Sequence, residues 1–163
     1  MDGLPLRHAD VAHAVQLRLR SVRRIVAGHL DGVAERRPGT WRRVCALDAV
    51  QIACMAALYR YGCDTPEAAE IARAGLTRAL GPLEAARALP LAELVRRLSG
   101  LWLSLHLGRG RLTLGRSALD VTHGPPAPRH PHSVTLDLGA IAAEVAERLA
   151  ETVPYRAGVP VIT

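Results

Sequence analysis

The sequence of 163 residues contains neither phenylalanine nor lysine, and aromatic residues make up only 3% of it. Apolar residues nevertheless make up 49%, so we expect a folded core of Leu, Val, Ile and Ala, in one domain or two small ones. All 21 basic residues are arginines. Because Ala, Leu and Gly are also abundant, this bias is typical of a GC-rich bacterial genome, and the use of Arg in place of Lys says little about function.

The sequence also lacks hydrophobic runs of the kind that membranes and secretory signals require. The longest apolar stretch, residues 49–59, contains Gln51 and is far shorter than a bilayer span. Residues 1–7 have no apolar run and no small-residue cleavage site. The three cysteines are an odd number, which argues against a disulfide framework and suits a reducing compartment. We therefore expect a cytoplasmic protein without a membrane partner.

Motifs that identify enzymes and metal sites are absent as well. There is no Gly-rich phosphate loop, no GxSxG elbow and no pair of carboxylates in a recognisable context, so we expect no enzymatic activity. The cysteines are spaced nine residues apart, whereas zinc sites use close pairs, and we expect Cys54 to be a packed small hydrophobe. Three histidines fall in a proline-rich loop without a carboxylate or thiolate partner, so we expect no metal and no cofactor. These residues are Cys45, Cys54 and Cys63, and His123, His130 and His132.

A local excess of arginine is the most informative feature that the sequence does contain. Eight arginines and only two acids lie between Leu17 and Arg43. The net charge of this segment, 8 − 2 = +6, equals the formal charge of the whole chain. A basic stripe of this kind is the electrostatic footprint of a nucleic-acid-binding face; the alternative is a solvated basic surface without a partner. The eight are Arg18, Arg20, Arg23, Arg24, Arg36, Arg37, Arg42 and Arg43.

The apolar spacing around the first of these arginines predicts a helix-turn-helix. Residues 9–16 place valines and an alanine on one helical face, and a second helix runs from Ser21 to about Gly28. The second helix turns Val22, Ile25 and Val26 inward, and Arg20, Arg23 and Arg24 outward. Two short helices joined by a tight turn, the second cationic on its exposed side, are typical of this motif.

A hairpin is predicted directly after the second helix. Residues 33–36 and 41–45 flank the segment 37–40, in which Pro38-Gly39 is a turn pair. A hairpin that follows a recognition helix is a wing, and the arginines of this wing suit contact with phosphate groups.

Further helices are predicted along the middle of the chain. One is expected over 47–61, where Gly62 ends it, and another begins at a cap on Asp64 or Thr65 and runs to about residue 80. A third helical segment, 83–98, is expected to be interrupted or kinked near Pro90.

Strand patterns begin after residue 100. Strands are expected over 101–107, 111–114 and 133–138, and an additional strand over 117–122 is left open. The first of these strands is apolar enough to suggest burial on both faces, which two packed copies of the chain would provide. A helix over 140–152 follows. Its inward residues are expected to be Ile141, Val145 and Leu149, and its outward residues Glu144, Glu147, Arg148 and Glu151.

These patterns predict an α+β, mostly helical fold in three parts. Residues 1–80 form an amino-terminal winged helix-turn-helix domain, and residues 81–99 a helical connector. Residues 100–152 form a small module of a β-hairpin, a further strand and a helix, which serves assembly or partner binding. Residues 153–163 are a tail. No internal repeat is evident.

Residues 9–72 resemble the winged helix-turn-helix domain of MerR-type regulators. The likeness is carried by the segments 11–25, Trp41-Arg42-Arg43-Val44, 47–52 and 58–71 in this order and spacing. The resemblance implies that Arg20, Arg23 and Arg24 lie on the recognition helix and Arg42 or Arg43 on the wing.

The sequence departs from the MerR pattern at several points. Gln16 stands where the family usually turns with glycine, and Arg18 where Ser or Thr caps the recognition helix. Ile25-Val26 replaces an aromatic pair, and Pro90 interrupts the segment where other members have a dimerising coiled coil. The carboxy-terminal module resembles the extra domain of phage-like or uncharacterised bacterial MerR-like proteins.

Together these features predict a DNA-binding transcriptional regulator of MerR-like type that binds double-stranded DNA, forms a homodimer and uses residues 100–152 for self-association or for a protein partner. A helix-turn-helix-derived protein-interaction module, antitoxin-like or phage-related, is the alternative, and a small metal sensor is a third class. The predicted DNA-binding residues are Arg18, Arg20, Ser21, Arg23, Arg24, Arg36, Arg37, Arg42 and Arg43.

Overall fold

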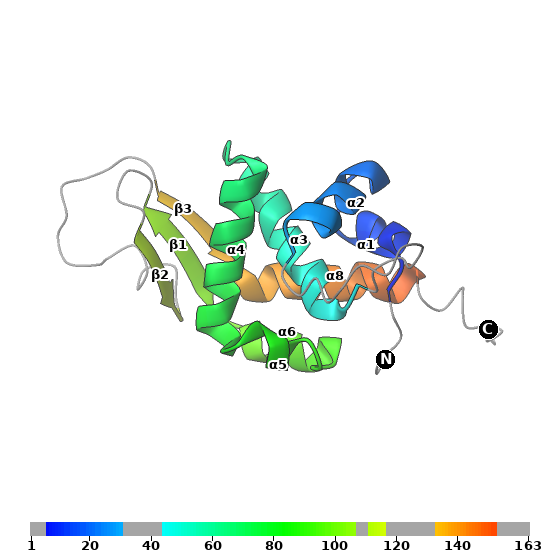
Figure 1. Ribbon diagram of the computed structural model, residues 1–163. Helices are drawn as coiled ribbons and strands as arrows, with labels where there is room; N and C mark the ends of the chain where they lie inside the picture. The colour runs from blue at the N-terminus through cyan, green and yellow to red at the C-terminus, as the bar shows by residue number, and fades with distance from the viewer. Residues whose placement is uncertain (1–5, 31–43, 107–110, 117–132, 153–163) are drawn as a thin grey trace.

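The computed structural model describes residues 6–30, 44–106, 111–116 and 133–152. Over these residues the protein is an α+β structure, mostly helical, with a small three-stranded antiparallel sheet (Figure 1). The predicted fold class is therefore confirmed at this level. The sheet lies at one end of the molecule and α1 and α2 at the other, with α3, α4 and α8 between them. The elements are α1 (His8–Ala14), α2 (Leu19–Gly28), α3 (Ala46–Tyr59), α4 (Thr65–Leu80), α5 (Leu83–Ala86), α6 (Leu91–Leu98), β1 (Trp102–His106), β2 (Arg111–Gly115), β3 (Ser133–Asp137) and α8 (Leu138–Thr152).

The described elements follow the predicted ones closely. The segment predicted over 83–98 is divided into α5 and α6, with Pro90 at the start of α6. The predicted hairpin lies outside the described residues except for Val44 and Cys45, and so does the strand left open at 117–122. Val44 forms an isolated antiparallel bridge with Leu6, whose N–H donates to the Val44 carbonyl at 3.0 Å.

At the start of four described helices a carboxylate accepts a hydrogen bond from a backbone N–H group. Asp10 accepts a hydrogen bond from the N–H of Arg7 in α1, at 2.9 Å, and Asp48 one from Cys45 in α3, at 3.0 Å. The Asp64 side chain caps α4 by accepting from the N–H of Glu67 at 2.8 Å, as predicted. At the start of α8, a carboxylate oxygen of Asp137 accepts from the N–H of Ala140 at 2.9 Å. Negative groups at these positions satisfy free N–H groups and stabilise the positive end of the helix dipole.

The sheet has the order β2-β1-β3, so β1 is the central strand. On one face Leu103 pairs with Leu114 and Leu136, and α4 covers it closely enough that a Cβ atom at Gly75 would meet the Leu103 side chain. On the other face Ser104 lies between Thr113 and Thr135. The two faces thus differ in polarity, but Ser104 is also fully buried, so the expected burial on both faces is confirmed at the centre of β1, within one chain. Leu103 and Leu105 are buried without a second copy of the chain.

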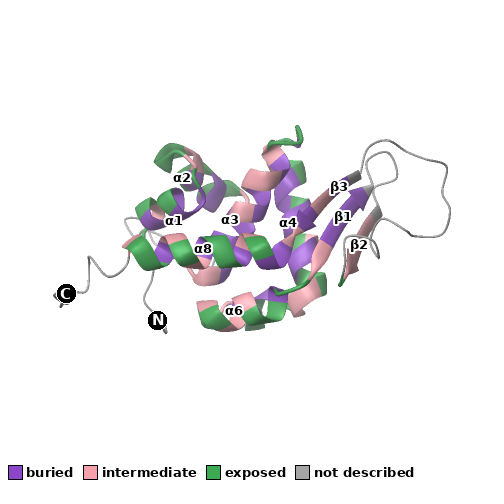
Figure 2. Cartoon of the chain, turned by 180° about the vertical axis from the view of Figure 1, so that it is seen from behind, coloured by how far each residue is buried: buried purple, intermediate pink, exposed green. Residues whose placement is uncertain are grey.

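One continuous cluster of buried side chains extends through all these elements (Figure 2). Helix α3 is buried on several sides, and α8 packs against α1, α3 and α6 as well as against β1 and β3. The carboxy-terminal helix thus lies directly against the first helix of the predicted helix-turn-helix. Members of this cluster lie on both sides of residues 80 and 100.

Candidate nucleic-acid interface

Helix α2 has one buried face and one arginine-rich face. Its buried residues are Val22, Ile25 and Val26, and it packs mainly on α1 at the edge of the molecule (Figures 1 and 2). No other element covers the opposite face among the described residues. The exposed side chains there are Arg20, Arg23 and Arg24, with Arg18 just before the helix and Ser21 half-buried. The structure thus brings together five of the nine residues predicted for DNA binding.

Three arginines at this end of α2 have no partner within the described part of the chain. The side chains of Arg18, Arg20 and Arg24 form no hydrogen bond or ion pair with another described residue. Four arginines elsewhere, those at 87, 96, 97 and 148, each pair with a carboxylate, whereas the exposed Arg60 and Arg116 resemble the α2 arginines in having no described partner. Among the described residues, the amino-terminal part of α2 and the residue before it thus gather three guanidinium groups that have no partner, at positions 18, 20 and 24.

The amino-terminal end of α2 differs from that of every other helix in the described ranges. It has no acidic residue in its first turn, whereas α1, α3, α4, α5 and α6 each carry an acid there and Asp137 serves α8. Arginines at 18 and 20 instead add positive charge to the positive end of the helix dipole. This arrangement costs stability in the free protein and favours a bound anion such as a phosphate. A surface hollow of about 400 Å³ lies there, lined among the described residues by Arg20, Ser21 and Arg24.

The turn between α1 and α2 is well formed without glycine. Gln16 adopts a left-handed backbone conformation with φ 53°. Its N–H donates to the carbonyl of His13 at 3.2 Å, and the N–H of Leu17 donates to the carbonyl of Ala12 at 3.1 Å. These two bonds are the Schellman pattern that ends many helices. The departure from the MerR pattern at Gln16 thus leaves a turn of the type that glycine usually makes.

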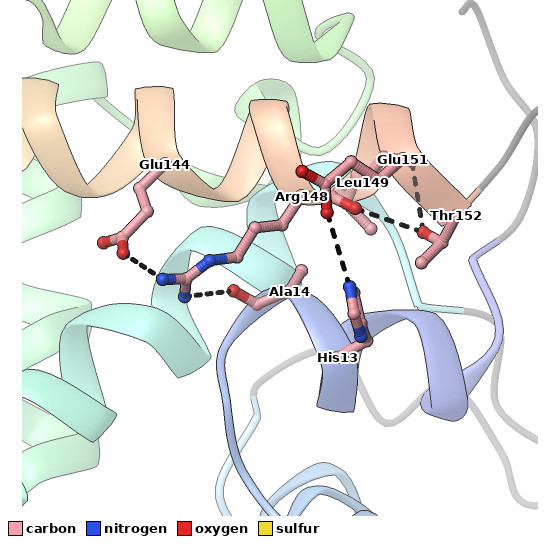
Figure 3. Close-up of polar contacts among 7 residues, drawn as sticks. All are labelled: His13, Ala14, Glu144, Arg148, Leu149, Glu151 and Thr152. Carbon is pink, nitrogen blue, oxygen red and sulfur yellow. Dashed lines mark hydrogen bonds and ion pairs between the residues drawn. The ribbon is translucent and has the colours of Figure 1, made fainter.

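The remaining predicted interface residues, Arg36, Arg37, Arg42 and Arg43, lie outside the described residues, as does the predicted wing. One residue that the sequence analysis placed wrongly is Arg148, expected to point outward. Its side chain is only 24% exposed and donates a hydrogen bond to the backbone carbonyl of Ala14, at the end of α1 (Figure 3). Helical periodicity could not show this contact, because the partner is a backbone atom far away in the sequence.

The described part of the chain offers little for metal or redox chemistry. No three side chains of the types His, Cys, Asp and Glu gather in a group that could hold a metal ion in the described ranges. His123, His130 and His132 lie outside these ranges. All three cysteines are free, and Cys54 is completely buried as predicted. Among the described helices, none combines the length and the hydrophobicity needed to cross a lipid bilayer.

Cys54 is expected to be inert toward thiol reagents in the folded protein. Burial raises the pKa of its thiol to about 12, and burial also raises the pKa of Cys45 and Cys63. Because the thiolate is the reactive form, iodoacetamide at pH 8 should leave Cys54 unmodified in the native protein and label it in urea. Peptide mass spectrometry measures the modified fraction. Labelling of native Cys54 at the rate of a free cysteine would contradict its burial in α3.

Comparison with protein-family models, with curated proteins and with solved structures gave no significant match.

Proposed function

We propose that the protein is a cytoplasmic DNA-binding transcriptional regulator of MerR-like type and that α2 is its recognition helix. The observation that carries this proposal is the amino-terminal end of α2, where exposed arginines stand in place of the carboxylates that the other described helices have at their starts. Local arrangements that cost stability are expected at functional sites. Here the missing negative charge is one that a phosphate of the DNA backbone supplies.

The dimensions of α2 suit this role. A helix of 10 residues is roughly 15 Å long, and the major groove of B-DNA is about 12 Å wide, which admits one α-helix. With its apolar side against α1, α2 would present Arg20, Arg23 and Arg24 to the groove and its phosphate edges. Phosphate contacts by arginines of this kind supply most of the non-specific affinity for DNA.

Two further parts of the proposal extend beyond the described residues. The wing around residues 33–45, with Arg36, Arg37, Arg42 and Arg43, would contact the flanking backbone. A homodimer would place two copies of α2 on an operator with twofold symmetry. Since the leucines of β1 are already buried within one chain, dimerisation rests on the symmetry of such operators and not on an uncovered strand.

The test is to replace Arg20 and Arg24 together by alanine and to measure binding to a labelled 30-base-pair duplex by fluorescence anisotropy. Because both side chains would release counterions on contacting phosphate, the slope of log K against log salt should fall by about two units. The thermal unfolding midpoint should stay the same or rise, since Arg20 leaves the positive end of α2 and Arg24 forms no hydrogen bond or ion pair with another described residue.

A matched control removes the same charge elsewhere. Arg96 and Arg97 on α6 are exposed and pair only with Glu93 among the described residues. Their double replacement by alanine should leave the salt slope unchanged. Equal effects of the two double variants would mean that net charge, and not α2, governs binding.

The second candidate is a protein-interaction module derived from a helix-turn-helix. The exposed apolar side chain of Leu19, at the start of α2, favours it. This alternative predicts no binding of the duplex even at 50 mM salt, together with a stable complex with a protein partner that the neutral-to-charged substitution Leu19→Asp disrupts.

A further inference from the structure

The carboxy-terminal helix lies side by side with the first helix of the proposed DNA-binding unit (Figures 1 and 3). Val145 and Leu149 of α8 and Val11 of α1 are fully buried members of the same core cluster. Two polar contacts run along the edge of this packed surface. They join α8 to the last turn of α1, immediately before the turn that leads into α2.

The first contact completes the hydrogen bonding at the end of α1. A helix leaves its last four carbonyls without partners from its own backbone ladder. Here the Val11 carbonyl accepts from the N–H of Val15 at 2.9 Å. Those of Ala12 and His13 accept from the turn residues Leu17 and Gln16, as described above. The last carbonyl, that of Ala14, accepts from Nη1 of Arg148 at 3.1 Å.

Arg148 is well placed to hold this position. Its second guanidinium nitrogen donates to the carboxylate of Glu144, one turn earlier on α8, which fixes the direction of the planar group. The second contact between the helices joins Nε2 of His13 and a carboxylate oxygen of Glu151 at 3.6 Å. Both side chains of this second pair are exposed, so the better sheltered link is the one that Arg148 makes.

We infer that Arg148 is a positioning residue for DNA recognition. By binding the terminal carbonyl of α1 from α8, it holds the α1–α2 turn in the conformation that orients α2. Gln16 adopts the left-handed conformation in this turn, which a residue with a Cβ atom adopts only at an energetic cost. The hydrogen bond from α8 therefore stabilises a turn whose own backbone conformation is unfavourable. The inference rests on the proposed function, and its test has one part that does not depend on DNA.

The first part of the test measures hydrogen exchange of the Gln16 and Leu17 amides by NMR. Arg148→Met keeps the aliphatic stem but removes the donor to Ala14. We expect exchange of both amides to be about tenfold faster than in the unsubstituted protein, because loss of a hydrogen bond to a charged group changes an equilibrium by about this factor. The control Glu144→Gln retains the donor to Ala14 and should leave exchange within about twofold. Unchanged exchange in Arg148→Met would overturn the inference.

The second part measures duplex binding. Arg148→Met should raise Kd about tenfold. The slope of log K against log salt should stay constant because no phosphate contact is lost, and the fraction of the protein that can bind the duplex should stay constant because the protein remains folded. A merely structural role would lower the active fraction and leave Kd unchanged. Arg97→Met, which removes the same charge from α6, is the control for net charge. Equal values of Kd in Arg148→Met and the unsubstituted protein would also overturn the inference.

Failure of the proposed function gives a different result. If the unsubstituted protein itself does not bind DNA, the recognition-helix proposal is wrong. The exchange measurement then decides alone whether Arg148 holds the turn.

Discussion

Replacing Arg87 by methionine is expected to lower the free energy of unfolding by about 3 kcal/mol, because it leaves a carboxylate uncompensated in the core. Asp48 on α3 is only 1% exposed. One of its oxygens accepts from Nη2 of Arg87 at 2.5 Å, and the other from the N–H of Cys45 at 3.0 Å. Methionine preserves the stem of the side chain, so the loss reports on the guanidinium group. For a chain of this length the unfolding midpoint should fall by about 6 to 12 °C.

The size of this effect follows from the position of the pair. An exposed ion pair is worth about 0 to 1 kcal/mol, whereas removing one partner of a buried pair costs about 3 to 5. The Arg87 side chain is 26% exposed, so water reaches the site in part and we expect the lower end of that range. Arg96→Met on the exposed surface of α6 is the matched control and should cost less than about 1 kcal/mol.

Urea unfolding followed by circular dichroism measures both variants. Adding Asp48→Asn to Arg87→Met should restore at least about 1 kcal/mol, since the amide oxygen can still accept from Cys45 while the buried charge is gone. A loss below about 1 kcal/mol in Arg87→Met would show that the carboxylate is stabilised without its partner.

Local signals in the sequence were sufficient to predict the helices. Asp64 as a cap, Pro66 in the first turn and the breaks at Gly62 and Pro90 each act within one turn of the backbone, and each element begins or ends near the expected residue. The two faces of α2 were predictable for the same reason, because residues three and four apart share a face.

Contacts between distant segments were not predictable in this way. The pairing of Asp48 with Arg87 joins residues 39 apart in the sequence, and that of Arg148 with Ala14 joins residues 134 apart. Periodicity indicates which side of its own helix a residue occupies, but not which backbone group another helix brings near it. Long arginine stems add to this difficulty, because they pack against apolar surface while their charged ends reach a partner.

The strand β1 shows a related limit. Trp102 next to three leucines made both faces look apolar, although the alternation of leucine with Ser104 and His106 already contained the correct period. The register with β2 and β3 shows that the leucines share one face.

The packing of α4 against this leucine face predicts the second large effect on stability. Leu103 is 1% exposed at the centre of the sheet, and its replacement by alanine is expected to lower the free energy of unfolding by about 3 kcal/mol, the usual cost of lost burial plus a cavity. The effect should appear as a lower urea midpoint with an unchanged m value. Leu19→Ala, at an exposed position on α2, is the control and should cost less than about 1 kcal/mol.

A substitution at Gly75 tests whether the close approach of α4 to β1 causes the loss of stability expected for Leu103→Ala. A Cβ atom at this position would overlap Cδ2 of Leu103 and lie 3.1 Å from Cδ1. Overpacking costs about 1 to 3 kcal/mol and alanine gains about 1 kcal/mol over glycine in a helix, so Gly75→Ala alone should lower stability by about 1 kcal/mol. In the double variant Gly75→Ala with Leu103→Ala, the new methyl group enters the vacated space. The two losses should therefore fall short of additivity by at least about 1 kcal/mol, whereas additivity within about 0.5 kcal/mol would show that the two positions are not in contact.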